Sequence, residues 1–256
     1  METNQSVARA LQILEVLARA PEPLGIREIA RAIGVAPSIA QRLVATLMQS
    51  GFAEQDATRR YGIGARAQAL GNSQPTANAL VREALPELEV LAREHRFNGY
   101  LGILRGTSVV YLLAFQSSGP IAINVRIGST APLHSTALGK ALLAGLDDEE
   151  ARRLLGREPY ARVTPRTHRR WAALRPEIAR ARSTGYTVSA QENLLGIFAI
   201  GAPVIDASGA VAGAISGALS VHEAPATQKP LLIRRITDAA QRISRRLGAA
   251  PQRKAA

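Results

Sequence analysis

The segment Pro132–Gly145, PLHSTALGKALLAG, concentrates residue types that carry chemistry. It combines a histidine, a serine, a threonine and a Gly-Lys pair with an apolar tail typical of a helix. Such a segment can be a catalytic centre, a phosphate-binding loop or the wall of a binding pocket. The motif that each chemistry requires distinguishes between these alternatives.

A phosphate-binding loop of the Walker A type requires the pattern G-x-x-x-x-G-K-[ST]. Here Gly139 and Lys140 are followed by Ala141, and no glycine lies at the required upstream position near Leu133. The segment therefore does not match such a loop.

Serine-based catalysis requires a base and an orienting carboxylate that converge on the nucleophile, often in a G-x-S-x-G elbow. His134 and Ser135 are neighbours whose side chains point in different directions in most backbones, and the elbow is absent from the sequence. The chain has no cysteine, and its four histidines, at 95, 134, 168 and 222, show no metal-ligand spacing. We therefore expect no enzyme activity, no metal and no cofactor.

The composition indicates a folded protein with an anionic partner. The 256 residues are 46% hydrophobic, and the formal net charge is +12. Such a charge favours nucleic acid, although an arginine-rich surface is the alternative, and most of the excess lies beyond residue 150. The polar start and the absence of an uncharged apolar run of about 20 residues predict a soluble, cytoplasmic chain without membrane contact.

The N-terminal pattern predicts a winged helix-turn-helix. We expect a helix over 6–20 with Ser6 as N-cap and Val7, Leu11, Leu14 and Leu17 or Ala18 on its inner face. A short helix over 26–33 ends at Gly34, and a second one starts near Ser38, a candidate N-cap, with Ile39, Leu43 and Leu47 inward. The stretch FAEQDATRRYGIG then predicts two short strands around a polar tip, which form the wing.

The remainder predicts an α+β domain. The run GNSQPT at 71–76 indicates a linker, and a long helix with a kink at Pro86 follows. NGYLGILRG, SVVYLLAFQ and IAINVRIG predict strands. Three helices follow, and the third tolerates Pro176 if this residue sits in its first turn. FAIGAPVID and AVAGAISGALS predict two more strands before a closing amphipathic helix. The order lacks the βαβ alternation of a doubly wound sheet.

Several motifs in this order resemble the IclR family of bacterial transcriptional regulators over nearly the whole chain. They are SVARALQILEVLA, REIARAIGVAPSIAQRLVATLMQSGFAE and YGIGARAQALG in the first part, and LHSTALGKALLA, TGYTVSAQENLLGIFAIGAPVID and AISGALS in the second. The resemblance implies a winged helix-turn-helix domain over 1–71, a linker and linker helix over 72–96, a GAF-like effector-binding domain over 97–250 and a disordered tail over 251–256. It also implies a homodimer or homotetramer on palindromic double-stranded DNA, with a small-molecule effector.

The second helix of the motif enters the major groove, so its outward residues are the candidates for base contacts. These are Ser38, Gln41, Arg42 and Thr46. Arg42 can bind guanine and Gln41 adenine, while the alternative for Arg42 is a solvated or backbone-contacting side chain. Arg27, Arg59 and Arg60 are expected at phosphates or in the minor groove. Relatives usually have threonine where this chain has Ile39, so one polar contact is expected to be missing.

The resemblance also assigns the opening segment to a pocket. A helix that begins at Thr136 presents unpaired N–H groups that suit a carboxylate. In the family this helix start lines the effector pocket, and the matching wall residues are Ile123, Ala131, Ala137, Leu138, Ser189, Ile197, Ala199, Ser216 and Ala218. For the apolar ones, plain core packing is the alternative.

Two departures from the family pattern bear on the ligand. Ser189 stands where relatives commonly carry an acidic residue, and the usual Glu-Glu pair is Gln191-Glu192. Loss of a negative wall residue favours the binding of an anion. We therefore expect the ligand to be a small organic acid, either aliphatic or aromatic. Lys140, one turn into the helix, faces either the pocket or solvent.

Two other classes compete with an effector-controlled regulator. One is an enzyme with an appended helical domain, for which the sequence supplies no convergent catalytic set. The other is a DNA-binding architectural protein whose second domain only oligomerises. Repression or activation, and a dimer or a tetramer, stay open at this stage.

Overall fold

The computed structural model describes residues 4–71, 75–117, 123–222 and 228–250. It divides into two compact units, Met1–Pro75 and Thr76–Ala256. The expected tail over 251–256 and residues 72–74 of the expected linker lie outside the described residues. Each unit has its own hydrophobic core.

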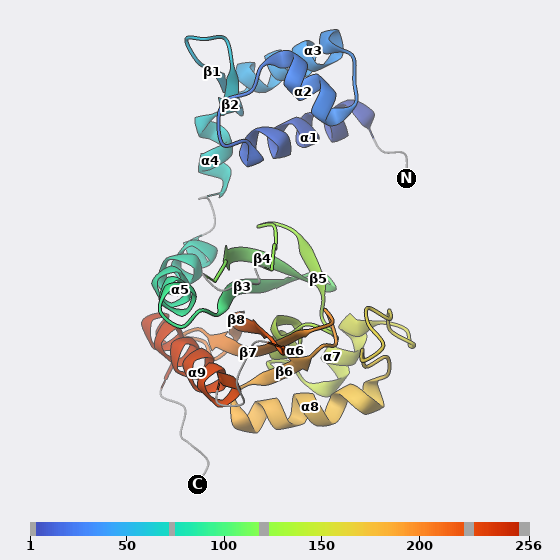
Figure 1. Cartoon of the computed structure of the whole chain (residues 1–256), viewed down its shortest axis with the longest axis vertical. Helices are drawn as coiled ribbons and strands as arrows, with labels where there is room; N and C mark the ends of the chain where they lie inside the picture. The colour runs from blue at the N-terminus through green and yellow to red at the C-terminus, as the bar shows by residue number, and fades with distance from the viewer. Residues whose placement is uncertain (1–3, 72–74, 118–122, 223–227, 251–256) are drawn as a thin grey trace. The chain divides into compact units, whose positions relative to one another are not determined.

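The first unit is a winged helix-turn-helix (Figure 1). Its wing strands β1 and β2 pair antiparallel, and Leu24 forms a further bridge to Tyr61 in β2. The elements are α1 (Gln5–Arg19), α2 (Ile26–Ile33), α3 (Pro37–Gln49), β1 (Ala53–Gln55), β2 (Tyr61–Ile63) and α4 (Ala65–Gly71). Ile13, Ile29 and Val44 are fully buried where the first three helices meet.

The first helix differs from the sequence prediction in its start and in its inner face. Asn4, not Ser6, is the N-cap, because its side chain accepts hydrogen bonds from the Ser6 and Val7 amides at 3.0 and 3.2 Å. Val7 and Leu11 are 56% and 57% exposed, whereas Ile13 and Leu17 are buried. The apolar residues of α1 therefore form two stripes, of which only one contacts the core of this unit.

The start of α3 also differs from expectation. Ala36 is the N-cap, and Pro37 occupies the first helical position. Proline is tolerated there because a backbone N–H at this position would have no intrahelical acceptor. Ser38 is therefore already inside the helix and is exposed. The buried stripe is Ala40, Val44 and Leu47, with Ile39 and Leu43 only partly buried at its margin.

The second unit is built on a six-stranded antiparallel sheet in the order β5-β4-β3-β8-β7-β6. Its strands are β3 (Asn98–Arg105), β4 (Ser108–Phe115), β5 (Thr130–Pro132), β6 (Thr187–Ala190), β7 (Ile197–Ile205) and β8 (Val211–Ser220). Its helices are α5 (Pro75–Arg93), α6 (Ala137–Ala144), α7 (Asp148–Leu155), α8 (Trp171–Thr184) and α9 (Gln228–Arg246). The expected α+β class is confirmed.

Helices cover both faces of the sheet (Figure 1). On one face α5 and α9 pack through Leu88 and Ile236 against strand residues such as Leu101. On the other face α6 and α8 pack through Leu142 and Ile178. The expected linker helix α5 is thus an integral part of the core of the second unit.

The local structure of the second unit differs from the sequence analysis at three places. Residues 123–128 of the expected strand IAINVRIG are irregular, and the short β5 follows instead. Strand β6 was not anticipated, because the polar residues around it hide its alternation. Pro176 is the sixth residue of α8, beyond the first turn, so the helix lacks one internal N–H donor there.

Candidate functional site

Helix α3 presents a polar face to solvent. Ser38, Gln41, Arg42 and Thr46 are all exposed and lie along one side, opposite the buried stripe. The Thr46 hydroxyl donates to the Arg42 carbonyl at 3.1 Å. The Gln41 amide nitrogen donates to the Tyr61 hydroxyl over a long distance of 3.4 Å. The described structure shows no partner for the Arg42 guanidinium, which leaves its donors available to an external acceptor.

The wing has a rigid tip that separates its two arginines. One carboxylate oxygen of Asp56 accepts hydrogen bonds from the Thr58 amide, the Thr58 hydroxyl and the Arg60 amide at 2.7–2.9 Å. These contacts, the Thr58 hydroxyl first, hold the pKa of Asp56 below its ordinary value. Arg59 has a left-handed backbone with φ of 61° and an exposed side chain. The tip therefore holds Arg59 outward without depending on DNA.

Arg60 instead binds within the first unit. Its guanidinium donates to the Pro23 carbonyl at 2.6 Å and to the Glu28 carboxylate at 2.8 Å, and the same Glu28 oxygen accepts the Gly25 amide at 2.7 Å. Arg60 thus fastens the wing to the start of α2. Arg27, the remaining candidate for a phosphate contact, lies on the first turn of α2 and is exposed.

Eight of the nine predicted pocket residues surround one cavity of about 80 Å³ in the second unit. They are Ile123, Ala137, Leu138, Ser189, Ile197, Ala199, Ser216 and Ala218. We call this cavity the effector pocket, after the role that the family resemblance predicts for it. The ninth residue, Ala131, lines a different cavity, because it lies in β5 at the edge of the sheet, paired with Val109.

Six further residues complete the pocket; the sequence analysis placed only the helix start at Thr136 there and did not assign the other five to it. They are Tyr100, Tyr111, Val125, Thr136, Asn193 and Leu194. The rings of Tyr100 and Tyr111 meet edge to face at 5.9 Å, and burial raises the pKa of both hydroxyls. The alternation of β3 and β4 was the available signal, because it places these tyrosines on the face that α6 covers.

The polar groups of the pocket are uncharged. The described residues that line it include no charged side chain. Thr136 caps α6 by accepting the Gly139 amide at 3.0 Å, and Ala137 and Leu138, the first two residues of the helix, have no intrahelical acceptor for their N–H groups. The Ser189 hydroxyl donates to the Ser135 carbonyl at 2.7 Å, so it can offer a ligand only its lone pairs.

Two glycines let the start of α6 approach its neighbours closely. A Cβ atom on Gly139 would lie 2.4 Å from the Leu133 carbonyl oxygen, and one on Gly201 would lie 2.3 Å from that of Ala137. No side chain larger than hydrogen fits at either position without a backbone shift. The helix end that lines the pocket is therefore set by backbone packing against the preceding turn and β7.

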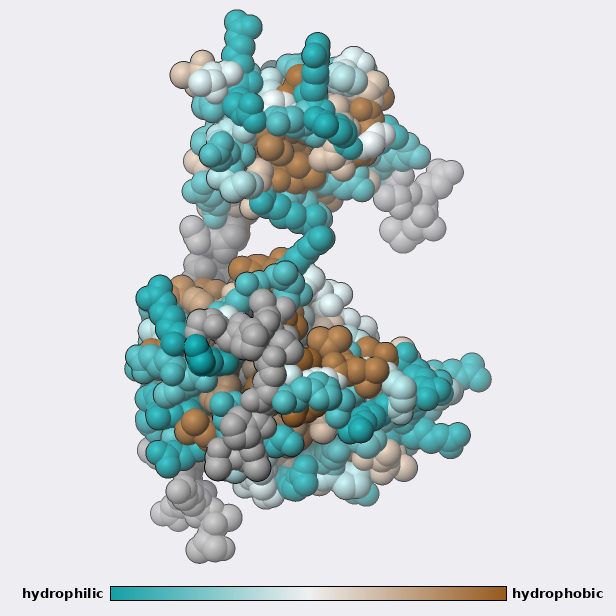
Figure 2. Space-filling model, in the orientation of Figure 1, coloured by the Kyte–Doolittle hydropathy of each residue, from teal (hydrophilic) through white to brown (hydrophobic). Residues whose placement is uncertain are grey.

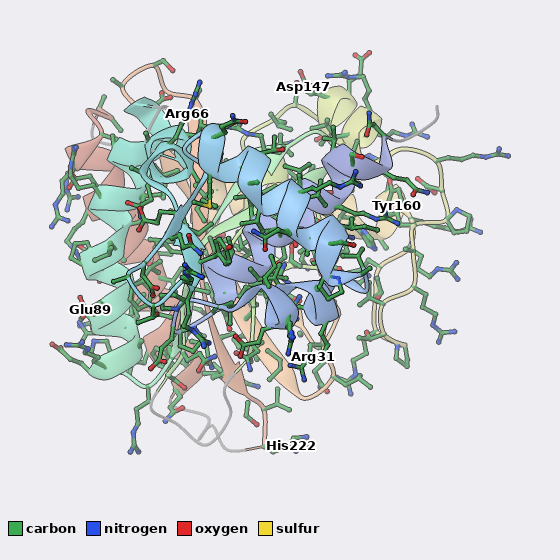
Figure 3. All side chains as sticks on the ribbon, turned by 90° about the horizontal axis from the view of Figure 1, so that it is seen from above. Arg31, Arg66, Glu89, Asp147, Tyr160 and His222 are labelled. Atoms are coloured by element: carbon green, nitrogen blue, oxygen red, sulfur yellow. The ribbon has the colours of Figure 1, made fainter. Side chains whose placement is uncertain are left out.

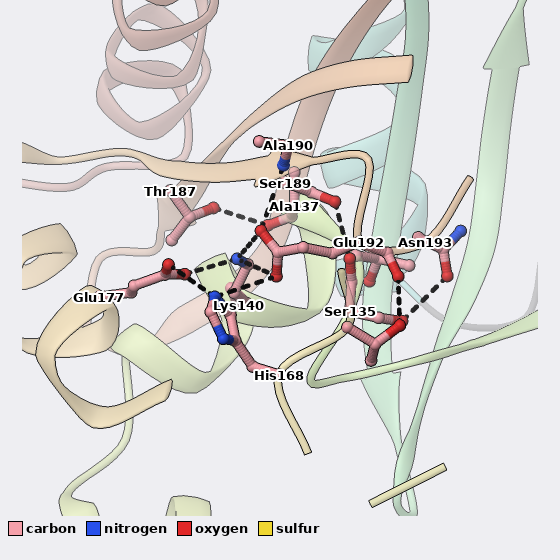
Figure 4. Close-up of polar contacts among 12 residues, drawn as sticks. Ser135, Ala137, Lys140, His168, Glu177, Thr187, Ser189, Ala190, Glu192 and Asn193 are labelled. Carbon is pink, nitrogen blue, oxygen red and sulfur yellow. Dashed lines mark hydrogen bonds and ion pairs between the residues drawn. The ribbon is translucent and has the colours of Figure 1, made fainter. Parts of the chain in front are cut away.

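Lys140 faces neither the pocket nor solvent. Its side chain is fully buried and does not line the pocket. Its ammonium lies 2.6 Å from the Glu177 carboxylate and 2.7 and 2.8 Å from the two oxygens of Glu192 (Figure 4). His168 Nε2 lies 3.1 Å from Glu177. We call these four residues the lysine cluster. It joins α6, α8 and the segment after β6.

The lysine cluster also braces the pocket wall. Glu192 accepts the Ala190 amide at 3.1 Å through its side chain, and its backbone carbonyl accepts the Thr167 hydroxyl at 2.7 Å. The adjacent Asn193, which lines the pocket, accepts the Ser135 hydroxyl at 3.0 Å. The charges therefore hold the segment that carries Ser189 and Asn193 against the start of α6 (Figure 4).

Three members of the cluster have donor types that a metal could use. Single donor atoms of His168, Glu177 and Glu192 lie within 4.8 Å of one another. The Lys140 ammonium already sits against both carboxylates and supplies the positive charge that they require. The arrangement is that of an internal ion pair network.

The cluster could have been found from the composition of α6. The helix ALGKALLA has one charged residue and no polar face, and all eight of its residues are buried. A helix that is apolar all round is buried on every side, so its only lysine needs an internal anion. The identity of that anion was not accessible, because Glu177 and Glu192 are distant in the sequence.

These features define the class of the protein as a DNA-binding transcriptional regulator. The first unit exposes the helix that reads DNA in winged helix-turn-helix proteins, and the second holds a pocket of about 80 Å³ beside the start of α6. None of the helices in the described parts of the chain is long and apolar enough to cross a membrane.

Comparison with known proteins identifies the family. The model for the IclR helix-turn-helix domain matches residues 6–57, and that for the C-terminal part of bacterial transcriptional regulator IclR matches residues 76–245. The chain belongs to the IclR family of bacterial transcriptional regulators, which are not enzymes.

Three similar proteins cover most of the chain. The glycerol operon regulatory protein of Streptomyces coelicolor is 33% identical over 96% of this chain and 97% of its own. An IclR transcriptional regulator from Alicyclobacillus acidocaldarius matches with a TM-score of 0.71 at 26% identity, over 96% and 100% of the two chains. An IclR homolog from Microbacterium hydrocarbonoxydans, solved with 4-hydroxybenzoate, gives 0.73 at 24% identity over 94% and 98%.

Proposed function

We propose that this regulator is controlled by a small carboxylic acid that binds in the effector pocket. The observation that carries the proposal is the start of α6, whose first two N–H groups lie at residues that line the pocket. A helix N-terminus favours a carboxylate, and the described lining has no acidic side chain to repel it. The homolog bound to 4-hydroxybenzoate supports the same chemical class.

The size of the pocket restricts the acid. A cavity of about 150 Å³ accommodates benzene in an engineered protein core, whereas this pocket measures about 80 Å³. A short aliphatic acid therefore fits better than an aromatic one in the conformation described. An aromatic acid requires displacement of the wall near Leu194, which is 48% exposed.

The proposal extends to the assembly on DNA. Val7 and Leu11 expose large apolar side chains on α1, on the side away from the core of the first unit. Apolar patches interrupt the otherwise hydrophilic surface that is visible in Figure 2. Pairing of two first units through α1 would cover these side chains and present two copies of α3 to a palindromic operator. Light scattering on the Leu11→Glu variant tests this: loss of the dimer supports it, and an unchanged mass contradicts it.

Isothermal titration tests the ligand class. Acetate, pyruvate and benzoate are titrated into the full chain beside the amides of the same acids. We expect the acids to bind and their amides to bind more weakly, because an amide lacks the charge that the helix start favours. Equal or better binding of the amides contradicts the proposal.

A pocket-filling variant provides the control. Ala218→Leu places a larger side chain into the pocket from β8, so acid binding should be lost while DNA binding is kept. If no acid binds the wild-type chain or raises its melting temperature, the alternative of an architectural protein with a ligand-free second unit is favoured.

A further inference from the structure

The positive charge of the chain is concentrated in the second unit. The first unit carries eight basic and six acidic side chains, whereas the second carries 24 basic and 14 acidic ones. The formal net charges of the two units are therefore +2 and +10. The recognition helix lies in the less basic unit, so DNA binding by that unit does not account for most of the charge.

The basic residues are densest between α7 and α8. Residues 157–170 contain five arginines and one acidic residue, and they form neither a helix nor a strand. We call residues 157–170 the arginine segment. Nitrogen-tipped side chains extend outward from the segment around Tyr160, which Figure 3 labels. All five arginines are exposed, namely Arg157, Arg162, Arg166, Arg169 and Arg170.

The guanidinium groups of the arginine segment are not neutralised within the protein. On the flanking helices, by contrast, Asp148 binds Arg175 at 2.6 Å and Arg182 at 2.7 Å. Among the described residues none of the five arginines of the segment has an ion-pair partner, and only Arg169 donates a side-chain hydrogen bond, to a backbone carbonyl. The carboxylate of Glu158 accepts a backbone amide at 3.0 Å. Since like charges repel, an external anion would stabilise this arrangement.

The backbone of the arginine segment is held in place from the inner side. The Thr167 hydroxyl is buried and donates to the Glu192 carbonyl at 2.7 Å, and the Tyr160 amide donates to the Arg169 carbonyl at 2.8 Å. Loops longer than about 12–15 residues without secondary structure are uncommon and usually functional. A backbone that is already fixed loses little conformational entropy when its outer side chains bind a partner.

The chemistry of the segment favours phosphate groups. All five cations are arginines, and the planar guanidinium binds phosphate with two parallel hydrogen bonds, which the lysine ammonium does not do. Duplex DNA presents phosphates at regular spacing along both strands. The first unit of the same chain binds DNA, so a tethered second unit meets duplex DNA at a raised effective concentration.

We propose that the arginine segment is a second DNA-binding surface, which binds the phosphates of duplex DNA without reading its bases. The first unit selects the operator, and the arginine segment adds affinity that is independent of sequence and sensitive to salt. The proposal does not depend on what the effector pocket binds.

Two variants of the full chain remove the same charge from different places. The segment variant changes three arginines of the segment to glutamine and keeps Arg170, which is the N-cap of α8. The control variant changes three arginines that are exposed on α8 and α9. The segment variant is Arg157→Gln, Arg162→Gln and Arg166→Gln, and the control variant is Arg180→Gln, Arg234→Gln and Arg245→Gln.

The salt dependence of DNA binding measures the number of phosphate contacts. Fluorescence anisotropy on a long duplex without an operator gives the affinity at several salt concentrations. Each contact contributes about 0.9 to the slope of log affinity against log salt, so the slope should fall by about two to three in the segment variant and by less than about one in the control. The melting temperatures of both variants should match the wild type, because no ion pair is lost.

A weakened first unit isolates the contribution of the second. Arg42→Ala and Arg59→Ala remove two exposed arginines of the first unit. In this background the remaining DNA binding should be lost when the segment changes are added, and kept when the control changes are added. Loss with both sets of changes, or with neither, contradicts a contact by the segment.

Three results of the salt titration would overturn the proposal. One is an equal slope for the wild type and the segment variant. Another is an equal fall in both variants, which would attribute the effect to overall charge. The third uses polyglutamate as a probe: if only the segment variant loses polyglutamate binding while its DNA slope stays that of the wild type, the surface binds an acidic protein instead of DNA.

Discussion

The ammonium of Lys140 and the carboxylate of Glu192, 52 residues apart in the chain, form a buried ion pair with both oxygens within 2.8 Å of Nζ. The lysine has no exposed surface, and the glutamate side chain is 5% exposed. Water cannot solvate either charge if its partner is removed.

Lys140→Met should therefore destabilise the chain by about 3–5 kcal/mol, because it leaves two carboxylates without their cation. Urea unfolding of the second unit measures the loss. A triple variant that adds Glu177→Gln and Glu192→Gln removes the stranded charges and should recover most of the stability. An unchanged free energy of unfolding in Lys140→Met contradicts a structural role for the cluster.

His134 should make stability depend on pH. Burial, the largest cause, lowers the pKa of this imidazole below its ordinary 6.5, and Lys140 acts in the same direction, while the Ala161 carbonyl and Glu192 oppose them. The unfolded chain therefore binds the proton at a higher pH than the folded chain, so stability falls as the pH drops below about 6.5 and levels off below the folded pKa.

His134→Gln keeps an amide donor for Ala161 and cannot be protonated. Its melting temperature should depend less on pH between about 7.5 and 5.5 than that of the wild type. Parallel melting curves for the two proteins would show that another group causes the acid sensitivity.

Arg42→Ala should weaken operator binding without affecting the fold, since the guanidinium has no partner in the described structure. If Arg42 binds guanine, the loss is about 1–3 kcal/mol for the specific site and smaller for unrelated DNA. Fluorescence anisotropy at fixed salt, on genomic fragments selected by the wild type, measures both. An equal loss on all sequences would assign Arg42 to a phosphate.

Arg59 and Arg60 are adjacent and should behave differently. Arg59→Ala should reduce the salt dependence of DNA binding by about one counterion, as expected for a phosphate contact. Arg60→Ala should chiefly loosen the wing, with a stability loss of at most about 1 kcal/mol, because its ion pair with Glu28 is 43% exposed on the arginine side. A smaller salt slope for Arg60→Ala than for Arg59→Ala would reverse this assignment.

Local patterns predicted most of the fold, and contacts between distant segments account for the misses. The apolar periodicity and the Gly34 stop located α2 and α3, and motif matching gathered eight pocket residues around one cavity. Periodicity could not decide which stripe of α1 is buried, because Val7 and Leu11 are as apolar as Ile13 and Leu17. The lysine cluster depends on the packing of α8, and the position of Ala131 in a different cavity depends on strand pairing at the edge of the sheet; single segments encode neither.

One short segment, residues 130–138, contributes to the walls of two cavities in the second unit. Residues 130–134 line the cavity of about 380 Å³ at the edge of the sheet, and Thr136, Ala137 and Leu138 line the effector pocket. A substitution anywhere in this segment can alter both cavities at once. A mutation in this segment that abolishes the response to a ligand therefore cannot be assigned to one cavity. Substitutions on the opposite walls can be assigned, because Arg157 lines only the cavity at the edge of the sheet and Ala218 lines only the effector pocket.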